Sequence, residues 1–301
     1  MLFKIIILRE MNEEIIYNTF VKYKLVSIDS RKVKEGSIFF GLRGENTDGN
    51  YYAEEALKRG AVMSVVDREE VVKDDRYVLV SDSLKALQDL ARRYRNSLSL
   101  PVIGITGSNG KTTTKELINS VLKEKYSVFC TQGNLNNHIG VPLSVLSIDE
   151  QKEVAVIEMG ANHLGEIKLL SEISCPDYGI ITNIGKAHIE GFGSYDGVIR
   201  AKSELYEYIK LKGGKLFVNE RDELLKKLSI GAEVIYYNRE KGLKAVNVNN
   251  TPYLSFDLYD NDKLVRCVKT KLVGSYNVIN ILCALEVGIY FGLSLDDCLR
   301  G

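Results

Sequence analysis

The sequence predicts an α/β protein with two domains, a small N-terminal α/β domain over residues 1–99 and a larger central domain over residues 100–301. Two observations predict this class. Short apolar runs alternate with helical segments along most of the chain, and continuous apolar strands of this kind are typical of parallel sheets covered by helices on both faces. The length of 301 residues also corresponds to about two domains of ~150 residues each.

The first domain is predicted as a short series of strands and helices. A boundary follows at 97–101, where Ser-Leu-Ser-Leu-Pro separates a helix from a new apolar strand. The strands are expected at 37–42, 61–66 and 77–80, and the helices at 52–59 and 84–95.

The central domain is predicted to contain a longer alternation and a mostly parallel sheet. Residues 243–273 lose this rhythm and favour β-hairpins, and residues 277–291 predict a closing amphipathic helix. The strands are expected at 102–106, 128–130, 154–157 and 178–182, and the helices at 111–125, 165–172 and 201–209.

Composition excludes several classes of protein. Lys plus Arg equals Asp plus Glu at 40 each, so no basic field favours nucleic acid or an anionic membrane. The five cysteines form no CxxC pair, which indicates free thiols in a reducing compartment. The apolar run at 2–8 is too short for a signal peptide or a membrane span. We therefore expect a cytoplasmic protein that neither binds nucleic acid nor inserts into a membrane. Separately, we expect it to be a monomer.

A glycine-rich loop follows the strand predicted at 102–106 and reads Gly-Ser-Asn-Gly-Lys-Thr over 107–112. Glycines let backbone N–H groups approach phosphates, and the start of the following helix adds its positive dipole end. Lys111 could reach the β- and γ-phosphates of ATP, and the Thr112 hydroxyl could bind Mg²⁺. The general P-loop pattern is not met, because Ile105 stands six residues before the lysine. A plain glycine turn with a solvated lysine is the alternative, and the flanking strand and helix favour the phosphate loop.

Two further side chains follow predicted strands, at the sheet edge where ligands of open α/β sheets gather. Glu158 ends the strand at 154–157 and could bind Mg²⁺ directly or through water, or be an ordinary solvated carboxylate. His188 follows the strand at 178–182 and could be a second metal ligand or hold a water beside the phosphates. A histidine with a structural role is the alternative reading.

Lys202 and an asparagine loop are the remaining candidates. Lys202 lies at the start of the helix predicted over 201–209, and an ordinary surface lysine there is the alternative. The loop at 131–140 carries Asn134, Asn136 and Asn137, whose amides can orient sugar or carbonyl groups without adding charge. Asparagine also tolerates left-handed backbone, so a simple turn competes with this reading.

Taken together, these segments resemble the Mur ligases of peptidoglycan synthesis, which are ATP-dependent amide-forming enzymes. The resemblance covers nearly the whole chain, and the variant phosphate loop fits the family. It is strongest for the branch that joins D-alanyl-D-alanine to UDP-N-acetylmuramoyl-tripeptide. The segments that carry it are 106–116, 133–142, 158–162, 187–194, and Asp29-Ser30-Arg31 with its continuation at 36–44.

The resemblance implies a division of labour. Residues 1–99 would bind the uridine nucleotide, and residues 100–301 would bind ATP and Mg²⁺. ATP would phosphorylate the terminal carboxylate of the tripeptide, and the dipeptide amine would then attack the acyl phosphate. Charge stabilisation and positioning supply most of the rate in such transfers.

The resemblance also implies a role for each candidate residue. Lys111, His188 and Lys202 would be catalytic, with Lys202 acting as an anionic carbamate, which is an oxygen donor suited to Mg²⁺. Tyr276 stands where the family usually has histidine, next to the segment near adenine. The implied ATP contacts are Gly107, Ser108, Asn109, Gly110, Lys111, Thr112, Thr113, Asn277 and Asn280; the substrate contacts are Ser30, Arg31, Asn134, Asn136 and Asn137; the metal ligands are Thr112 and Glu158 for one ion, and His188 and carbamylated Lys202 for a second.

Members of the family carry a third, Rossmann-like C-terminal domain that closes over ATP, and this chain stops at Gly301, where that domain would begin. We therefore expect binding of the UDP substrate, weakened ATP binding, and little or no ligation by the chain as it stands. One alternative is another amide ligase of the superfamily, such as one that adds a different amino acid, or glutamate to folate. The asparagine loop and the uridine-type first domain argue against it. A nucleotide-binding module without catalysis is a second alternative. A P-loop kinase or GTPase lacks support, because their base-recognition motifs are not found.

Overall fold

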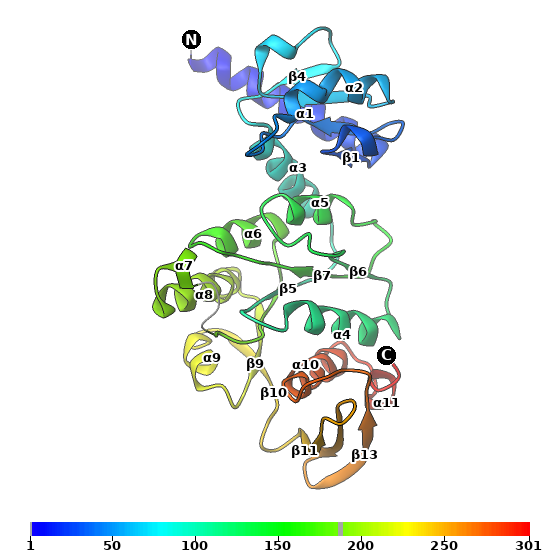
Figure 1. Cartoon of the computed structure of the whole chain (residues 1–301), viewed down its shortest axis with the longest axis vertical. Helices are drawn as coiled ribbons and strands as arrows, with labels where there is room; N and C mark the ends of the chain where they lie inside the picture. Colours follow the sequence, from blue (N-terminus) through cyan, green and yellow to red (C-terminus); the bar gives the residue numbers. More distant parts are fainter. Residues whose placement is uncertain (1, 186–188) are drawn as a thin grey trace. The chain divides into compact units, whose positions relative to one another are not determined.

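The computed structural model describes the backbone of residues 2–185 and 189–301, and the side chains from residue 11 onward except 186–190. The chain forms two compact units (Figure 1). The first comprises Met1–Ser99 and His138–Ile148, and the second comprises Leu100–Asn137 and Asp149–Gly301. The predicted α/β class with parallel sheets is confirmed.

The first unit is built on a parallel sheet with the strand order β1-β2-β3-β4. Side chains of β2, β3 and α2, such as Phe39, Val66 and Leu57, form its buried core. Helix α5 comes from the returning segment 138–148 and packs on α3. The elements are α1 (Leu2–Tyr23), β1 (Val26–Ser27), η1 (Ser30–Lys32), β2 (Ile38–Phe40), η2 (Gly49–Tyr52), α2 (Ala53–Lys58), β3 (Met63–Val66), η3 (Glu69–Val71), β4 (Tyr77–Leu79), α3 (Ser83–Ser97) and α5 (Gly140–Leu146).

Helix α1 has no counterpart among the predicted elements. Its buried side chains Ile16 and Phe20 are four residues apart, which is one helical turn. The Phe20 ring meets Tyr94 of α3 edge-on, with ring centroids 4.9 Å apart. This i, i+4 spacing was the signal in the sequence for the second half of the helix.

The second unit is built on a sheet whose described residues form six parallel strands in the order β10-β9-β8-β5-β7-β6. The predicted strands of the central domain are present, and β9 and β10 extend the sheet beyond the prediction. The strands are β5 (Val102–Thr106), β6 (Val128–Cys130), β7 (Val154–Glu158), β8 (Tyr178–Ile181), β9 (Lys215–Asn219) and β10 (Glu233–Tyr237).

Helices cover both faces of this sheet, as predicted. Figure 1 shows α4 and α10 side by side on one face, with α6 and α8 on the other. Ile103 and Ile105 of β5 pack with Ile118 of α4 and Ile281 of α10 in one buried cluster. The helices of this unit are α4 (Lys111–Lys123), α6 (Glu166–Ser174), α7 (Ile189–Phe192), α8 (Tyr195–Lys212), α9 (Glu223–Leu228), α10 (Asn277–Tyr290) and α11 (Leu295–Cys298).

A small antiparallel sheet confirms the hairpins predicted over 243–273. It consists of β11 (Leu243–Asn249), β12 (Ser255–Asp260) and β13 (Lys263–Lys269), paired in that order. Phe256 and Leu258 of β12 are buried in the same cluster as α10. Helix α10 therefore has neighbours on several sides and is buried along most of its length, so the predicted amphipathic character of this helix was wrong.

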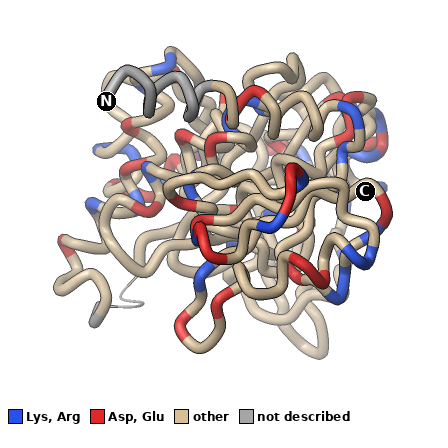
Figure 2. Tube along the Cα trace, turned by 90° about the horizontal axis from the view of Figure 1, so that it is seen from above, with Lys and Arg blue, Asp and Glu red and all other residues tan. Residues whose placement is uncertain are grey.

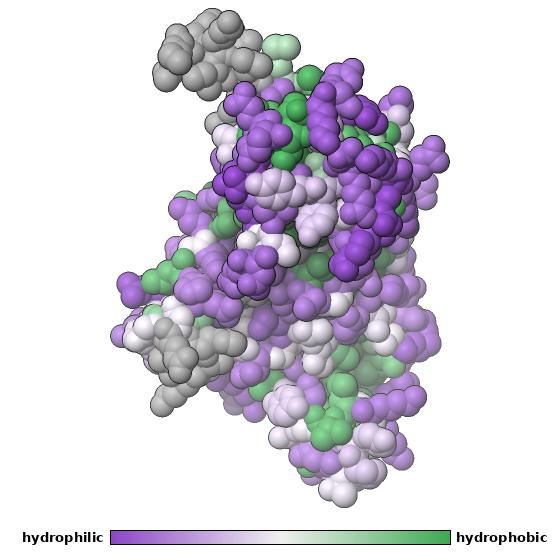
Figure 3. Space-filling view, turned by 45° about the horizontal axis from the view of Figure 1, so that its top comes forward, coloured by the Kyte–Doolittle hydropathy of each residue, from purple (hydrophilic) through white to green (hydrophobic). Residues whose placement is uncertain are grey.

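The described surface carries charges of both signs. Figure 2 shows basic and acidic residues interspersed along the chain, without a broad region of one sign. The face in Figure 3 is mostly hydrophilic, with small, scattered apolar areas. Among the described residues, no helix combines the length and apolarity needed to cross a membrane.

Candidate functional site

The loop 107–110 joins the carboxyl end of β5 to the start of α4 and has the geometry of an anion cradle. Gly107 has φ +146° and Gly110 has φ +78°, which are conformations that favour glycine. A Cβ on Gly107 would overlap the Thr182 hydroxyl. The first N–H groups of a helix have no partner within it, and such groups are suited to bind an anion.

The loop conformation gives a first prediction, on stability. Gly107→Ala should lower the free energy of unfolding by about 2 kcal/mol or more, because positive φ and steric overlap act together. Gly133→Ala is the matched control: its φ is +53°, but a Cβ there meets nothing within 4 Å, so we expect only about 1 kcal/mol. Urea unfolding of both variants measures the difference, and equal losses would contradict the steric argument.

The segment after β8 holds the loop in place. Ser108 N–H donates to the Asn183 carbonyl at 3.0 Å, and Asn109 N–H donates to the Asn183 side-chain oxygen at 3.1 Å. Thr182 Oγ1 donates to the Asn109 carbonyl at 2.6 Å. Asn183 was not among the predicted site residues, although its place directly after a strand was a usable signal. These bonds fix the loop before any ligand arrives.

Lys111 folds back over this loop. Its Nζ donates to the Gly107 carbonyl at 2.9 Å and lies 3.4 Å from the Ser108 carbonyl. Burial lowers the pKa of Lys111, and the nearby Glu158 carboxylate opposes that shift. The ammonium thus lies against the backbone carbonyls of the glycine-rich loop.

Glu158 ends β7 beside the start of α4, as predicted from its position. The residue is 1% exposed. Its Oε1 accepts from Thr112 Oγ1 at 3.1 Å and from Asn136 Nδ2 at 2.8 Å. Its Oε2 is buried and has no hydrogen-bond partner among the described residues. The structure therefore brings Thr112 and Glu158 together and leaves one carboxylate oxygen without a hydrogen bond from the described residues.

The asparagine loop contributes unequally to this site. Asn136 donates to Glu158, and its carbonyl accepts from Gly160 N–H at 2.7 Å. Asn134 and Asn137 are exposed. Asn136 thus helps to hold the Glu158 carboxylate in position.

The asparagines of α10 lie against the phosphate loop. A Cβ built on Gly110 would be 3.1 Å from Asn280 Nδ2, so the two residues are in direct contact. Asn280 Nδ2 donates to Asn277 Oδ1 at 2.9 Å, and Asn277 Nδ2 donates to the Val273 carbonyl at 2.9 Å. Both asparagines are buried, whereas the neighbouring Tyr276 is exposed. Thr113 lies in the first turn of α4, next to Thr112.

Lys202 is 3% exposed, so the reading of an ordinary surface lysine is wrong. Its predicted place at a helix start is also wrong, because α8 begins at Tyr195, where the Ser194 side chain accepts from Gly197 N–H. Lys202 Nζ donates to the Ala161 carbonyl at 3.3 Å and lies 5.4 Å from the centre of the Phe192 ring. Burial lowers the pKa of Lys202 to about 8. His188 lies outside the described residues.

Ser30 and Arg31 belong to the first unit, in the short helix η1. Ser30 is buried, and its hydroxyl donates to Glu55 Oε2 at 3.4 Å. The exposed Arg31 guanidinium makes two 2.9 Å bonds to the Asp29 carboxylate. This pairing lowers the pKa of Asp29 to about 2.

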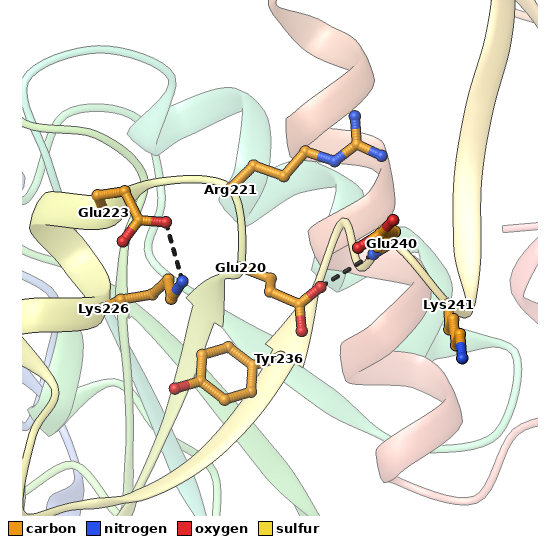
Figure 4. A pocket seen from close by; sticks show the side chains of 7 residues that line it. All are labelled: Glu220, Arg221, Glu223, Lys226, Tyr236, Glu240 and Lys241. Atoms are coloured by element: carbon orange, nitrogen blue, oxygen red, sulfur yellow. Dashed lines mark hydrogen bonds and ion pairs between the residues drawn. The ribbon is translucent and has the colours of Figure 1, made fainter.

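A separate pocket opens at the carboxyl ends of β9 and β10 (Figure 4). Its volume is about 770 Å³, and it includes none of the predicted site residues. Acidic and basic side chains line it together, and Lys226 pairs with Glu223 at 2.9 Å. The lining residues are Glu220, Arg221, Glu223, Lys226, Tyr236, Glu240 and Lys241.

The chemistry of the donors around Thr112 fits magnesium. The described residues contain no group of three or more His, Cys, Asp or Glu side chains able to hold a metal by themselves. Mg²⁺ is usually bound by one or two carboxylates together with phosphate oxygens and waters. One carboxylate beside a threonine hydroxyl, with a buried oxygen that accepts no hydrogen bond from the described residues, matches that requirement.

Comparison with known protein families identifies the family of this chain. The sequence model of the Mur ligase middle domain matches residues 105–288, and that of the Mur ligase family catalytic domain matches residues 22–95. The chain belongs to the Mur ligase family. The resemblance predicted from the sequence motifs is thereby confirmed.

Two curated relatives of this Mur ligase chain have the same name. A UDP-N-acetylmuramoyl-tripeptide–D-alanyl-D-alanine ligase of Bacillus subtilis is 36% identical in an alignment of 281 residues that covers 92% of this chain and 60% of the relative. The Escherichia coli enzyme of the same name is 32% identical and is matched over 62% of its length, again with 92% of this chain.

Solved structures agree with these relatives. MurF from Acinetobacter baumannii has a TM-score of 0.82 at 33% identity, with 92% of this chain and 62% of that chain covered. MurF ligase from Thermotoga maritima in complex with ADP has a TM-score of 0.82 at 30% identity, with 93% and 66% covered. The chain spans 60 to 66% of the length of these four relatives.

Proposed function

We propose that this Mur ligase chain binds ATP and UDP-N-acetylmuramoyl-tripeptide for the ligation of D-alanyl-D-alanine in peptidoglycan precursor synthesis. The main support is the juxtaposition of Thr112, Glu158 and the Lys111 ammonium at the start of α4. The names of the relatives, and the ADP bound to one solved neighbour, point in the same direction.

The proposed nucleotide site uses the phosphate loop and α10. Lys111 would exchange the Gly107 carbonyl for the γ-phosphate, and the N–H groups at the start of α4 would hold the other phosphate oxygens. Ser108 and Asn109 bond to Asn183, which shapes the loop. Asn280 contacts Gly110 and bonds to Asn277, and these two asparagines would lie near the adenosine. Thr112 and Glu158 would hold Mg²⁺, which neutralises charge on the phosphate oxygens when bound.

The proposed reaction has two steps. An oxygen of the tripeptide carboxylate forms a bond to the γ-phosphorus while the bond to the ADP oxygen breaks, giving an acyl phosphate and ADP. The dipeptide amine then attacks the acyl carbon, loses a proton, and phosphate leaves as the amide forms. The contribution of this chain is positioning and charge stabilisation, because such transfers need little covalent chemistry from the protein.

Lys202 is proposed to act as a carbamate that supplies an anionic oxygen to a second cation, together with His188. Carbamylation requires a neutral amine, which attacks CO₂ and loses a proton. Burial favours that neutral form, since the pKa of Lys202 falls to about 8. The sequestered position below the Ala161 carbonyl also protects the product from bulk water.

The first unit is proposed to bind the uridine nucleotide through Ser30 and Arg31, and the exposed Asn134 and Asn137 are proposed to contact the substrate. This gives the second prediction. UDP-N-acetylmuramoyl-tripeptide should raise the melting temperature by several degrees at about 100-fold above its Kd, where mass action adds about 2.7 kcal/mol. Thermal unfolding measures the shift, with UDP-N-acetylglucosamine at the same concentration as the control.

The outcomes of this experiment separate the proposed function from its alternatives. A shift with the tripeptide nucleotide and a second shift with ATP and Mg²⁺ support the ligase assignment. A shift with ATP and Mg²⁺ but none with the tripeptide nucleotide would favour a nucleotide-binding module. No shift with either ligand would contradict the proposal.

A further inference from the structure

Lys115 is a fully buried cation that the proposed reaction leaves unused. It lies in α4 one turn after Lys111, and its side chain is 0% exposed. Lysine is almost never fully buried unless it is paired. A lysine at this depth cannot meet a ligand from solvent, so its role has to be sought among its protein neighbours.

The ammonium of Lys115 has Thr131, Glu158 and Glu116 as neighbours. Lys115 Nζ donates to the Thr131 carbonyl at 2.7 Å and lies 4.0 Å from Glu158 Oε2. The hydroxyl of the same Thr131 accepts from Glu158 N–H at 3.0 Å. Lys115 also pairs at 2.9 Å with Glu116, whose side chain is 58% exposed. The ammonium thus supports the backbone of Glu158 through Thr131 and approaches its carboxylate directly.

The two oxygens of Glu158 have different surroundings. Oε1 accepts two hydrogen bonds, from Thr112 and Asn136, whereas Oε2 is buried without a hydrogen-bond partner among the described residues. A buried carboxylate that loses its counter-charge is strongly destabilised. Lys115 places a positive charge 4.0 Å from Oε2, the oxygen that accepts no hydrogen bond from the described residues.

We propose that Lys115 is a positioning residue, whose ammonium compensates the charge of Glu158 and keeps Oε2, the oxygen without a hydrogen bond, in place for Mg²⁺. This inference rests on the proposed nucleotide and magnesium site. The competing role is a structural tie between α4 and the end of β6 through the Thr131 carbonyl. The two roles differ in what they do to metal-dependent binding.

The test is calorimetry of ADP binding to the whole chain, with Mg²⁺ and with EDTA, which gives the factor by which metal tightens binding. Lys115→Met should reduce this factor by about tenfold or more, and change metal-free affinity by less than about threefold. Lys115→Arg, which keeps the charge, should restore much of the factor. Lys123→Met is the matched control and should leave the factor unchanged, because Lys123 is an exposed lysine in the last turn of the same helix.

A double variant keeps the test decisive if Lys115→Met does not fold. Lys115→Met/Glu158→Gln removes both charges, so it should fold, and it should show the same metal factor as Glu158→Gln alone. Equal losses with Mg²⁺ and with EDTA, or a double variant that also fails to fold, would show a structural tie and overturn the proposal. A wild-type chain whose ADP binding is insensitive to Mg²⁺ would instead overturn the proposed magnesium site.

Discussion

Lys111→Ala should weaken ATP binding by about 100-fold, while the folded state stays as stable as before or becomes more stable. Hydrogen bonds from an ammonium to phosphate are charge-assisted, and losing two of them at about 1.5 kcal/mol each gives an effect of this size. In the free protein the same ammonium contacts loop carbonyls, and burial lowers its pKa, so its charge is a cost to folding. Alanine also has the higher helix propensity.

The control for this variant comes from the other end of the same helix. Lys123→Ala removes an exposed lysine from the last turn of α4 and should leave ATP affinity unchanged. Calorimetry for affinity and urea unfolding for stability are measured on both variants. A loss of affinity in Lys111→Ala that is matched by a loss of stability would assign Lys111 to the loop rather than to the phosphate.

The phosphate loop could be predicted because its signal is local in the sequence. The backbone at positions 107 and 110 has positive φ, which favours glycine, and Lys111 directly follows Gly110 as the first residue of α4. Glu158 could be predicted from a more general rule, since the carboxyl ends of parallel strands share one edge of the sheet. The structure places Thr112 and Glu158 in contact, although 46 positions separate them in the chain.

Other parts of the site depend on contacts that spacing does not encode. Asn183 supports the phosphate loop from the segment after β8. Nothing in the sequence distinguishes Lys115 from an ordinary helical lysine, because its contacts with Thr131 and Glu158 arise only in the folded chain. Lys202 was expected at the helix start because the apolar pattern becomes clear only from residue 201. The Ser194 cap starts α8 earlier and carries Lys202 into the buried part of the helix.

Strands β9 and β10 were not predicted, and the reason is again that their place depends on contacts between distant segments. Leu216, Phe217 and Val218 form an apolar run, but it is short and follows two glycines, so it reads equally well as part of a loop. The parallel pairing of β9 with β8 gives it its place in the sheet. Helix α10 illustrates the opposite case, since its location was predicted and its burial by β12 was not.

Lys202→Met should stabilise the protein at pH 7 by about 3 kcal/mol in CO₂-free buffer, because a pKa lowered from 10.5 to about 8 means that the buried ammonium costs that much. The sign follows from proton uptake. Between pH 8 and 10.5 the unfolded chain binds more protons at Lys202 than the folded chain, so wild-type stability rises with pH. The advantage of the variant should therefore shrink across this window and disappear near pH 10.5. Urea unfolding at pH 7, 9 and 10.5 measures it.

The groups that act on Lys202 explain why its amine is available for carbamylation. Burial is the largest cause of the lowered pKa and Lys111 adds to it, whereas Glu166 and Glu204 oppose it. The shift makes the neutral share of the amine near pH 7 about 300-fold larger than for a solvated lysine. ¹³C-labelled bicarbonate should therefore give a carbamate carbon signal in the wild type and none in Lys202→Met. The two measurements test different claims. If the stability difference depends on pH but no carbamate signal is seen, Lys202 is a buried amine with a lowered pKa that does not form a carbamate, and it is then not a metal ligand.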